Sequence, residues 1–181
     1  MKHTTYHKQS VQKKLDVYTK TVDDYESLNK HLITVIDELK KTKKCFNSNV
    51  KAWHTFPYLQ KETKEFDGLI NICLDFIYEI NEKEFSLPKE DLQYECINLW
   101  AMKYSTGEYA LKHNHYPANW SCVYYIDVVP DQSPIVFEDV NVVYPKNGDL
   151  IMFNGMIDHD VPPTTNERIA VSMNFMHKGA P

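Results

Sequence analysis

Arginine is nearly absent from this chain. Of the 20 lysine and arginine residues, 19 are lysines, and Arg168 is the single arginine. Lysine serves wherever a positive charge alone is sufficient. A lone arginine is therefore a candidate for a position that needs a planar guanidinium, such as bidentate binding of a carboxylate. The alternative is that Arg168 is an ordinary surface residue without such a role.

A basic surface, a long apolar segment and paired cysteines are also lacking. The formal net charge of −5 argues against nucleic-acid binding through the phosphate backbone. No apolar run approaches the roughly 20 residues of a membrane span, and the N-terminal stretch MKHTTYHKQS is too polar for a secretory signal. The four cysteines show no CxxC spacing, so we expect reduced thiols, no disulfides and a cytoplasmic protein.

What the chain does contain is sufficient for one folded domain. Hydrophobic residues make up 43% of the sequence and aromatic residues 13%, which is ample for a core. A length of 181 residues matches a single domain. We therefore expect one domain over residues 1–181, with a mainly helical part over residues 1–95 and a β-rich part over residues 96–178.

The first part is predicted to hold one strand and two helices. LDVYTKTV, residues 15–22, is typical of a strand because of its β-branched and aromatic residues. Asp23 or Asp24 can cap the helix that follows, whose apolar residues from Leu28 to Leu39 recur at helical spacing. The second helix has the clearest apolar stripe, from Phe66 to Ile80. Between the helices, FNSNVKAWHTFPY indicates a loop with a short extended piece.

Helical spacing disappears after about Cys96. Six β-rich runs follow, separated by turn signals such as STGE and PKNGD: CINLWAMKY, EYALKHNHY, WSCVYYIDVV, PIVFEDV, DLIMFNG and RIAVSMNFM. Several short strands in this rhythm indicate a sandwich or a barrel. No linker separates them from the helices, so we expect the helices to pack on a sheet.

Two histidines stand one residue apart in the second of these runs. Residues i and i+2 of a strand point to the same face, so His113 and His115 are expected to project together and to be able to share a metal ion. His159 follows the strand-like DLIMFNG and its turn, and Arg168 opens the last strand nine residues later. This order predicts a metal site, although a single histidine in a strand is more often structural. The remaining histidines lack such a context and are expected to be ordinary: His3, His7, His31, His54 and His177.

The segment from LWAMKY to AVSMNF, together with SNVKAWHT upstream, resembles the Fe(II)- and 2-oxoglutarate-dependent oxygenases. It is most similar to a small group of oxygenases distantly related to prolyl hydroxylases. The resemblance implies an α+β fold, with a double-stranded β-helix (jelly roll) core and N-terminal helices packed on one sheet. It also implies a dioxygenase that uses Fe(II) and 2-oxoglutarate, with ascorbate as a reductant, to hydroxylate an unactivated C–H bond of a protein side chain or a small molecule.

The resemblance assigns roles to six residues. His113, His115 and His159 match the three metal ligands. Arg168 matches the basic residue that binds the far carboxylate of 2-oxoglutarate, and Tyr104 and Tyr125 match tyrosines that help to hold the same cosubstrate.

His115 departs from the family pattern, because the usual ligand set is two histidines and one carboxylate. A set of three histidines leaves one more positive charge on the metal. The alternative is that His115 lies behind the ligands and that Glu138 or Asp139, in FEDV, supplies the carboxylate. Five residues are candidates by strand position for the lining of the barrel mouth, although each of them alone is more often part of the core: Tyr116, Trp120, Tyr124, Phe153 and Met173.

Two other functions remain open at this point. A jelly roll that binds a metal or a small ligand without catalysis, as many cupins do, has no need of a carboxylate-binding Arg168. A zinc hydrolase can also use H-x-H, but the β-rich half is too short for the α/β barrels that usually carry that motif.

Overall fold

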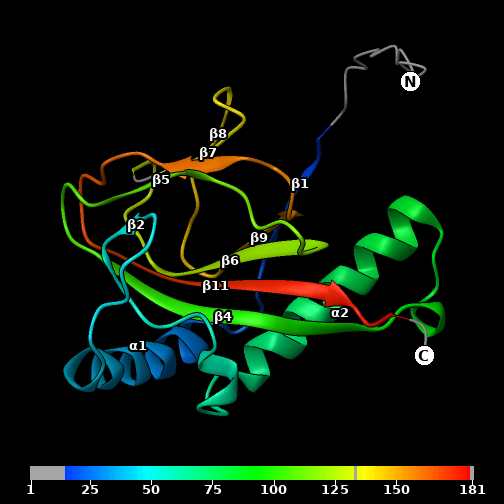
Figure 1. Ribbon diagram of the computed structural model, residues 1–181, viewed down its shortest axis with the longest axis horizontal. Helices are drawn as coiled ribbons and strands as arrows, with labels where there is room; N and C mark the ends of the chain where they lie inside the picture. The colour runs from blue at the N-terminus through cyan, green and yellow to red at the C-terminus, as the bar shows by residue number, and fades with distance from the viewer. Residues whose placement is uncertain (1–14, 133, 180–181) are drawn as a thin grey trace, which may run out of the picture.

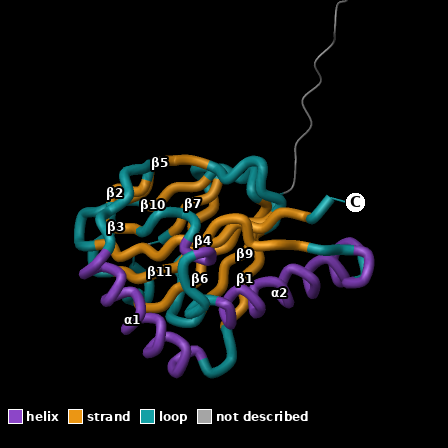
Figure 2. Tube along the Cα trace, turned by 60° about the horizontal axis from the view of Figure 1, so that its bottom comes forward, coloured by secondary structure: helices purple, strands orange, loops and turns teal. Residues whose placement is uncertain are grey.

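The computed structural model describes residues 15–132 and 134–179. Within these residues, two α-helices and eleven β-strands form three layers (Figures 1 and 2). The helices α1 (Tyr25–Thr42) and α2 (Asp67–Phe85) cover one face of a six-stranded sheet, and a five-stranded sheet lies over its other face. Two short 3-10 turns lie at Leu59–Lys61 and Lys89–Asp91.

Both sheets are antiparallel throughout their described strands. The larger sheet has the order β1-β9-β6-β11-β4-β3 and the smaller sheet the order β2-β5-β10-β7-β8. The larger sheet consists of β1 (Val17–Thr21), β9 (Asp149–Asn154), β6 (Trp120–Asp127), β11 (Arg168–His177), β4 (Tyr94–Tyr104) and β3 (Trp53–His54). The smaller sheet consists of β2 (Val50–Lys51), β5 (Tyr109–His113), β10 (His159–Val161), β7 (Ile135–Phe137) and β8 (Asn141–Val143). The first 95 residues thus supply three whole strands besides the two helices.

The central strands of the larger sheet are covered on both faces. One apolar cluster lies between this sheet and the helices, and a second fills the space between the two sheets. Tyr124 and Tyr125 are neighbours on β6 and therefore point to opposite faces. Tyr124 packs toward the helices, where its hydroxyl donates to Asn29 Oδ1 on α1 at 2.6 Å. Tyr125 belongs to the cluster between the sheets.

The same alternation fixes which side chains of β11 enter the space between the sheets. Arg168, Ser172 and Asn174 are separated from one another by two, four or six positions, so they share one face of the strand. On the adjacent β4, Arg168 pairs with Tyr104, and Asn174 pairs with Asn98. At about 3.3 Å per residue, these two pairs stand roughly 20 Å apart, so one continuous strip of side chains runs from the arginine to the asparagines.

The predicted elements are present, with local differences. Each of the six β-rich runs contains a strand, but β8 and β10 are additional strands that the sequence pattern did not indicate. Asp24 precedes α1, yet its side chain makes no capping hydrogen bond, because the residue adopts a left-handed conformation with φ 51°. The expected cap at Asp23 or Asp24 is therefore wrong as a side-chain interaction.

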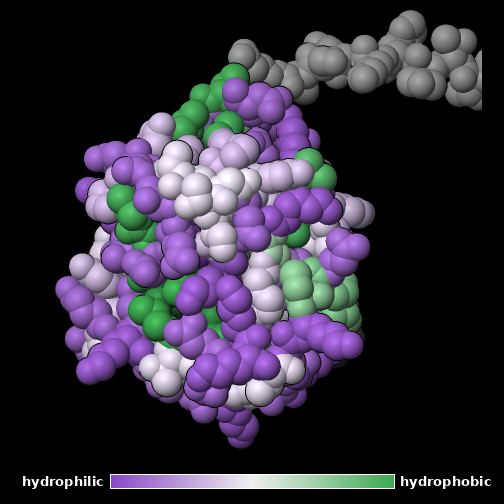
Figure 3. Space-filling view, turned by 90° about the vertical axis from the view of Figure 1, so that its left-hand side faces the viewer, coloured by the Kyte–Doolittle hydropathy of each residue, from purple (hydrophilic) through white to green (hydrophobic). Residues whose placement is uncertain are grey.

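The surface gives no sign of a broad apolar face on the side seen in Figure 3. That side is mainly hydrophilic, and its hydrophobic residues form small, separate patches. No helix in the described ranges is long and apolar enough to cross a membrane.

Candidate metal centre and the cavities beside it

Two of the three predicted ligands lie directly opposite each other in the smaller sheet. His113 is the last residue of β5 and His159 the first residue of β10, and the two are partners in the antiparallel register. Their ring centroids are 4.4 Å apart. The strand pairing thus brings together two histidines that are 46 positions apart in the sequence.

His115 lies outside the strand in which it was expected. β5 ends at His113, and the Asn114 side chain then accepts a hydrogen bond from the backbone N–H of Tyr116 at 3.2 Å. This Asx turn, followed by Pro117, ends the strand pairing. The His115 N–H donates to the carbonyl of Gly155 at 2.7 Å, which holds the loop in place. The prediction that His115 lies in the same strand as His113 is therefore wrong, but the His115 ring still reaches the other two histidines.

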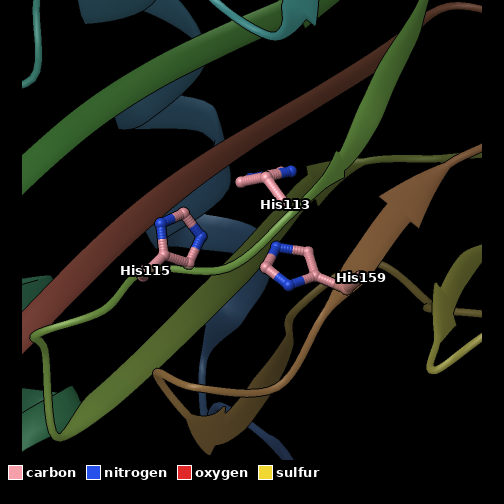
Figure 4. Close-up of side chains that lie close together, drawn as sticks. All are labelled: His113, His115 and His159. Atoms are coloured by element: carbon pink, nitrogen blue, oxygen red, sulfur yellow. The ribbon is translucent and has the colours of Figure 1, made fainter.

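The three rings gather around one common space (Figure 4). Their potential ligand atoms all lie within 4.8 Å of one another, and the His115 centroid is 4.9 Å from that of His113 and 5.0 Å from that of His159. Three nitrogens that bind one ion at about 2.0–2.1 Å each lie roughly 3–3.5 Å apart in tetrahedral or octahedral geometry. Ligand-atom separations of up to 4.8 Å therefore have to shorten by roughly 1–2 Å when the rings close on a metal ion.

Hydrogen bonds select which nitrogen of two rings is free to bind a metal. His113 Nδ1–H donates to the carbonyl of Leu111 at 2.7 Å, and His159 Nδ1–H donates to the carbonyl of Ile157 at 3.1 Å. Nε2 of each ring then carries the lone pair. Backbone carbonyls in this position are the usual partners of metal-binding histidines.

Burial keeps these histidines neutral. It lowers the pKa of His113, lowers that of His115 well below the ordinary histidine value, and lowers that of His159 to about 4. The proximity of the rings adds to the shift of His115 and His159, because two positive charges would repel. At neutral pH the lone pairs are available to a cation without competition from protons.

No carboxylate joins the three histidines among the residues that the structure describes. The two carboxylates considered as alternatives are engaged elsewhere. Glu138 Oε1 accepts a hydrogen bond from the backbone of Asp158 at 3.0 Å, and Asp139 forms an ion pair with Lys112. The donor set in the structure is therefore three imidazoles, which suits divalent iron, zinc, copper or nickel.

Substituting His115 by aspartate tests whether it is a ligand. We expect His115→Asp to retain a divalent metal, because a carboxylate at this position gives two histidines and one anion, and His115→Ala to bind it at least about tenfold more weakly. Without metal, His115→Asp should be less stable than the wild type by about 1–3 kcal/mol, since an unpaired carboxylate is then half-buried among aromatic rings. Metal affinity by calorimetry and melting temperature are measured on the same proteins. Wild-type metal affinity in folded His115→Ala would count against direct ligation.

Arg168 is enclosed at the start of β11. It is 1% exposed, and its guanidinium carbon lies 5.2 Å from the Tyr104 ring centroid and 4.9 Å from that of Tyr125. Its Nη2 donates to the Tyr125 hydroxyl at 3.3 Å, and its Nη1 to the carbonyl of Pro134 at 3.5 Å. Burial raises the pKa of Tyr104 to about 12 and also raises that of Tyr125, so both rings are neutral. The surface interpretation of the single arginine is thus wrong.

One narrow internal cavity connects the arginine with the histidines. The inner cavity, about 20 Å³ in volume, is lined by Arg168 and Tyr104 at one end and by all three histidines. A second, outer pocket of about 300 Å³ adjoins it, and His113, His115 and Trp100 line both spaces. The histidines therefore stand between a narrow space that adjoins a buried cation and a larger pocket.

Of the five candidates for the lining of the barrel mouth, one lies at the histidines. Phe153 does face the histidines, with its ring centroid 4.8 Å from that of His159. Trp120, Tyr124 and Met173 instead belong to the core between the larger sheet and the helices, and Tyr116 is 74% exposed. His54, which was expected to be ordinary, lines the outer pocket, as does Trp100, whose ring centroid is 5.5 Å from that of His115.

Comparison with known proteins gives structural similarity alone. A scan against protein-family models finds no match, and neither does a search of curated proteins. A prolyl-4-hydroxylase of Pseudomonas putida superposes with a TM-score of 0.63 at 14% identity, over 90% of this chain and 93% of that one. The viral collagen prolyl hydroxylase of Paramecium bursaria Chlorella virus-1, solved as a 2-oxoglutarate complex, gives 0.61 at 16% identity, over 87% and 95%. The α-ketoglutarate-dependent epimerase SnoN of nogalamycin biosynthesis gives 0.67 at 11% identity, over 88% and 77%.

These similarities confirm the predicted fold class. The chain has the α+β architecture of the prolyl hydroxylases and 2-oxoglutarate-dependent enzymes, with a jelly-roll core and helices on one sheet. Since an epimerase shares the fold with two hydroxylases, the fold alone does not specify the reaction.

Proposed function

We propose that this protein is an Fe(II)- and 2-oxoglutarate-dependent oxygenase that hydroxylates an unactivated C–H bond of a protein side chain or a small molecule. The observation that carries the proposal is the inner cavity, which joins a three-histidine group to a buried arginine. A cupin-like protein that only binds a metal has no use for such an arginine. The fold, shared with a prolyl hydroxylase solved in complex with 2-oxoglutarate, supports the same conclusion.

His113, His115 and His159 would hold the iron, because they are neutral, close together and free of a competing carboxylate. When bound, Fe(II) and 2-oxoglutarate would supply the oxidising chemistry, in which one atom of O₂ enters succinate as CO₂ is lost and the other enters the substrate. The outer pocket offers the substrate a place next to the histidines.

Arg168 would bind the far carboxylate of 2-oxoglutarate. It is the one cationic side chain in the lining of the inner cavity among the described residues, and both tyrosines that enclose it are uncharged. A buried guanidinium attracts a carboxylate more strongly than an exposed one does, since little water competes. The cavity is narrow, so we expect the flexible Met102 side chain, which is part of its lining, to shift when the diacid enters.

Anaerobic titration tests the proposal directly. Fe(II) and 2-oxoglutarate are added to the protein without O₂, and the visible absorption is recorded. We expect a metal-to-ligand charge-transfer band that needs protein, Fe(II) and 2-oxoglutarate together. Succinate, which lacks the keto group, is the matched control and should give no band. A protein that binds Fe(II) but shows neither the band nor calorimetric binding of 2-oxoglutarate is a metal-binding jelly roll of the cupin kind instead.

A further inference from the structure

Among the residues that the structure describes, none with a charged side chain lines the outer pocket. Its lining of twelve residues comprises four asparagines, three histidines, one serine and four apolar residues. Lys51 and Asp158 lie just outside the lining, where Lys51 Nζ donates to the carbonyl of Ser48 at 2.7 Å and Asp158 accepts from the Asn114 side chain at 2.8 Å. A ligand in this pocket therefore meets only uncharged protein groups.

The third histidine of the lining is also neutral. His54 Nδ1–H donates to the carbonyl of Thr55 at 3.0 Å, so its Nε2 accepts a hydrogen bond from the Ser48 hydroxyl at 2.9 Å. Burial lowers the pKa of His54. This ring cannot serve as the cation that a carboxylate or phosphate group would require.

Asn49 lines the pocket, and its side chain has an unused donor. Its Nδ2 is buried and has no hydrogen-bond partner within the described part of the chain. The backbone around it is fixed, because the Asn49 carbonyl accepts from Leu111 N on β5 at 3.0 Å and the Val50 N–H donates to Ser48 Oγ at 3.1 Å. A buried N–H without a partner costs about 1–3 kcal/mol, and a carbonyl oxygen of a ligand would remove that cost.

Two more carboxamides are held in fixed orientations deeper in the pocket. Asn174 Oδ1 accepts from the Ser121 hydroxyl at 2.8 Å, and Asn174 Nδ2 donates to Asn98 Oδ1 at 3.4 Å. Asn98 Nδ2 in turn donates to the carbonyl of Pro57 at 3.4 Å. The two bonds of 3.4 Å are long and leave both amides able to bond a ligand as well. The amides are therefore preorganised for a polar, neutral group.

Aromatic rings continue from the pocket onto the surface. Phe46 lines the pocket, its ring centroid is 4.9 Å from that of Phe56, and the Phe56 centroid is 5.3 Å from that of Tyr58. Phe56 is 48% exposed and Tyr58 is 40% exposed. This row offers apolar contact to the part of a ligand that extends beyond the pocket.

We propose that the outer pocket binds an uncharged, amide-bearing part of the substrate. Its carbonyl accepts a hydrogen bond from Asn49 Nδ2, and its apolar flank lies against Phe46 and Trp100. The proposal rests on the proposed function in that this placement brings the substrate beside His113 and His115. A charged group would lose its hydration here without gaining a counter-charge, which is strongly unfavourable. The amide can belong to a peptide segment or to a free small molecule, and the experiment separates these sources.

Three probes that share the leucine side chain and differ in charge test the charge preference. N-acetyl-leucinamide is neutral, N-acetyl-leucine carries a carboxylate, and leucinamide carries an ammonium group. Each is titrated into the metal-free wild-type protein, and the backbone amide signals of the pocket residues are followed by NMR. We expect the neutral probe to bind about tenfold more tightly than either charged one. Equal binding of a charged probe, or no binding of any of the three, would overturn the proposal.

Substitution of Asn49 links the preference to its carboxamide. Asn49→Asp should weaken the neutral probe about tenfold and favour leucinamide, because the donor becomes an anion. Asn71→Asp, on the exposed face of α2, makes the same charge change and should alter neither. An Asn49→Asp protein with wild-type probe affinities would contradict the assignment.

The length of the probe that binds best identifies the source of the amide. The charge-transfer band tests the iron chemistry in a separate experiment. A neutral N-acetyl tripeptide amide that binds more tightly than N-acetyl-leucinamide supports a peptide, and equal binding supports a free small amide. Because these measurements use metal-free protein, a missing charge-transfer band would refute the oxygenase while leaving the pocket preference intact. Loss of the preference with the band present would refute only the ligand class.

Discussion

His159→Ala is expected to abolish stable Fe(II) binding, with an affinity at least about 100-fold below that of the wild type. Removing even a side chain behind a ligand costs 10–100-fold in metal affinity, and His159 is itself one of the three donors brought together between β5 and β10. The two remaining histidines cannot hold the ion as firmly. Iron content after anaerobic loading and desalting measures the effect, and His113→Ala should behave in the same way.

His54→Ala is the matched control for this experiment. His54 and His159 are both 3% exposed, so their replacement by alanine removes the same buried ring, but His54 is not part of the three-histidine group. We expect this variant to keep wild-type iron content. Circular dichroism and melting curves on all three variants separate loss of a ligand from loss of the fold. Wild-type iron stoichiometry in folded His159→Ala would disprove the ligand assignment.

The elements that the sequence predicts best are those whose pattern is local. The stripe from Phe66 to Ile80 repeats along one helix face, and α2 follows it. The long strands β4, β6, β9 and β11 are near-continuous runs of apolar and aromatic residues, as expected for strands covered on both faces. β10 was not predicted, because a strand of three residues is defined by its partners β5 and β7 rather than by its own sequence.

The same burial on both faces explains why the pocket lining could not be predicted. Where both sides of a strand are apolar, alternation does not say which side faces the helices. Trp120, Tyr124 and Met173 were therefore candidates for both the barrel mouth and the core, and they pack under the helices. His115 was expected in the strand but lies in a loop, because the Asn114 side chain and Pro117 end β5 earlier than the β-rich composition suggests.

The outer pocket could not have been predicted from the sequence. It joins Ser48 and His54, from the connection between the helices, to Asn174 near the end of the last strand. No local pattern relates residues more than 100 positions apart. A polar stretch such as FNSN, ahead of a histidine, would have been the available signal, and it is equally typical of an ordinary loop.

Arg168→Lys is expected to weaken 2-oxoglutarate binding by about one order of magnitude or more, and Arg168→Ala to weaken it further. The guanidinium can offer two parallel donors to a carboxylate, whereas an ammonium group is a point charge. Charge-assisted hydrogen bonds contribute roughly 1.5–3 kcal/mol each, and each 1.4 kcal/mol is a factor of ten. Calorimetry with 2-oxoglutarate on the metal-loaded proteins gives the dissociation constants.

Tyr125→Phe separates the charge of Arg168 from its positioning. The Tyr125 hydroxyl accepts a hydrogen bond from Arg168 Nη2 at 3.3 Å, and its ring faces the guanidinium carbon at 4.9 Å. Phenylalanine keeps the ring and removes the hydroxyl, so we expect a loss of affinity smaller than that of Arg168→Lys. A loss as large as that of Arg168→Ala would instead show that the orientation of the guanidinium, more than its presence, determines binding.

Iron affinity measured without 2-oxoglutarate should be the same in wild type, Arg168→Lys and Arg168→Ala, because the metal group consists of three histidines and does not include Arg168. This control distinguishes a loss of 2-oxoglutarate binding from a general loss of the site. A variant that loses iron as well has lost the fold or the cavity, and a melting curve identifies that case. If folded Arg168→Ala binds 2-oxoglutarate with the wild-type dissociation constant, the buried arginine serves only to join Tyr104 and Tyr125. The oxygenase proposal then loses the observation on which it stands, and the non-catalytic jelly roll becomes the better account of the three histidines.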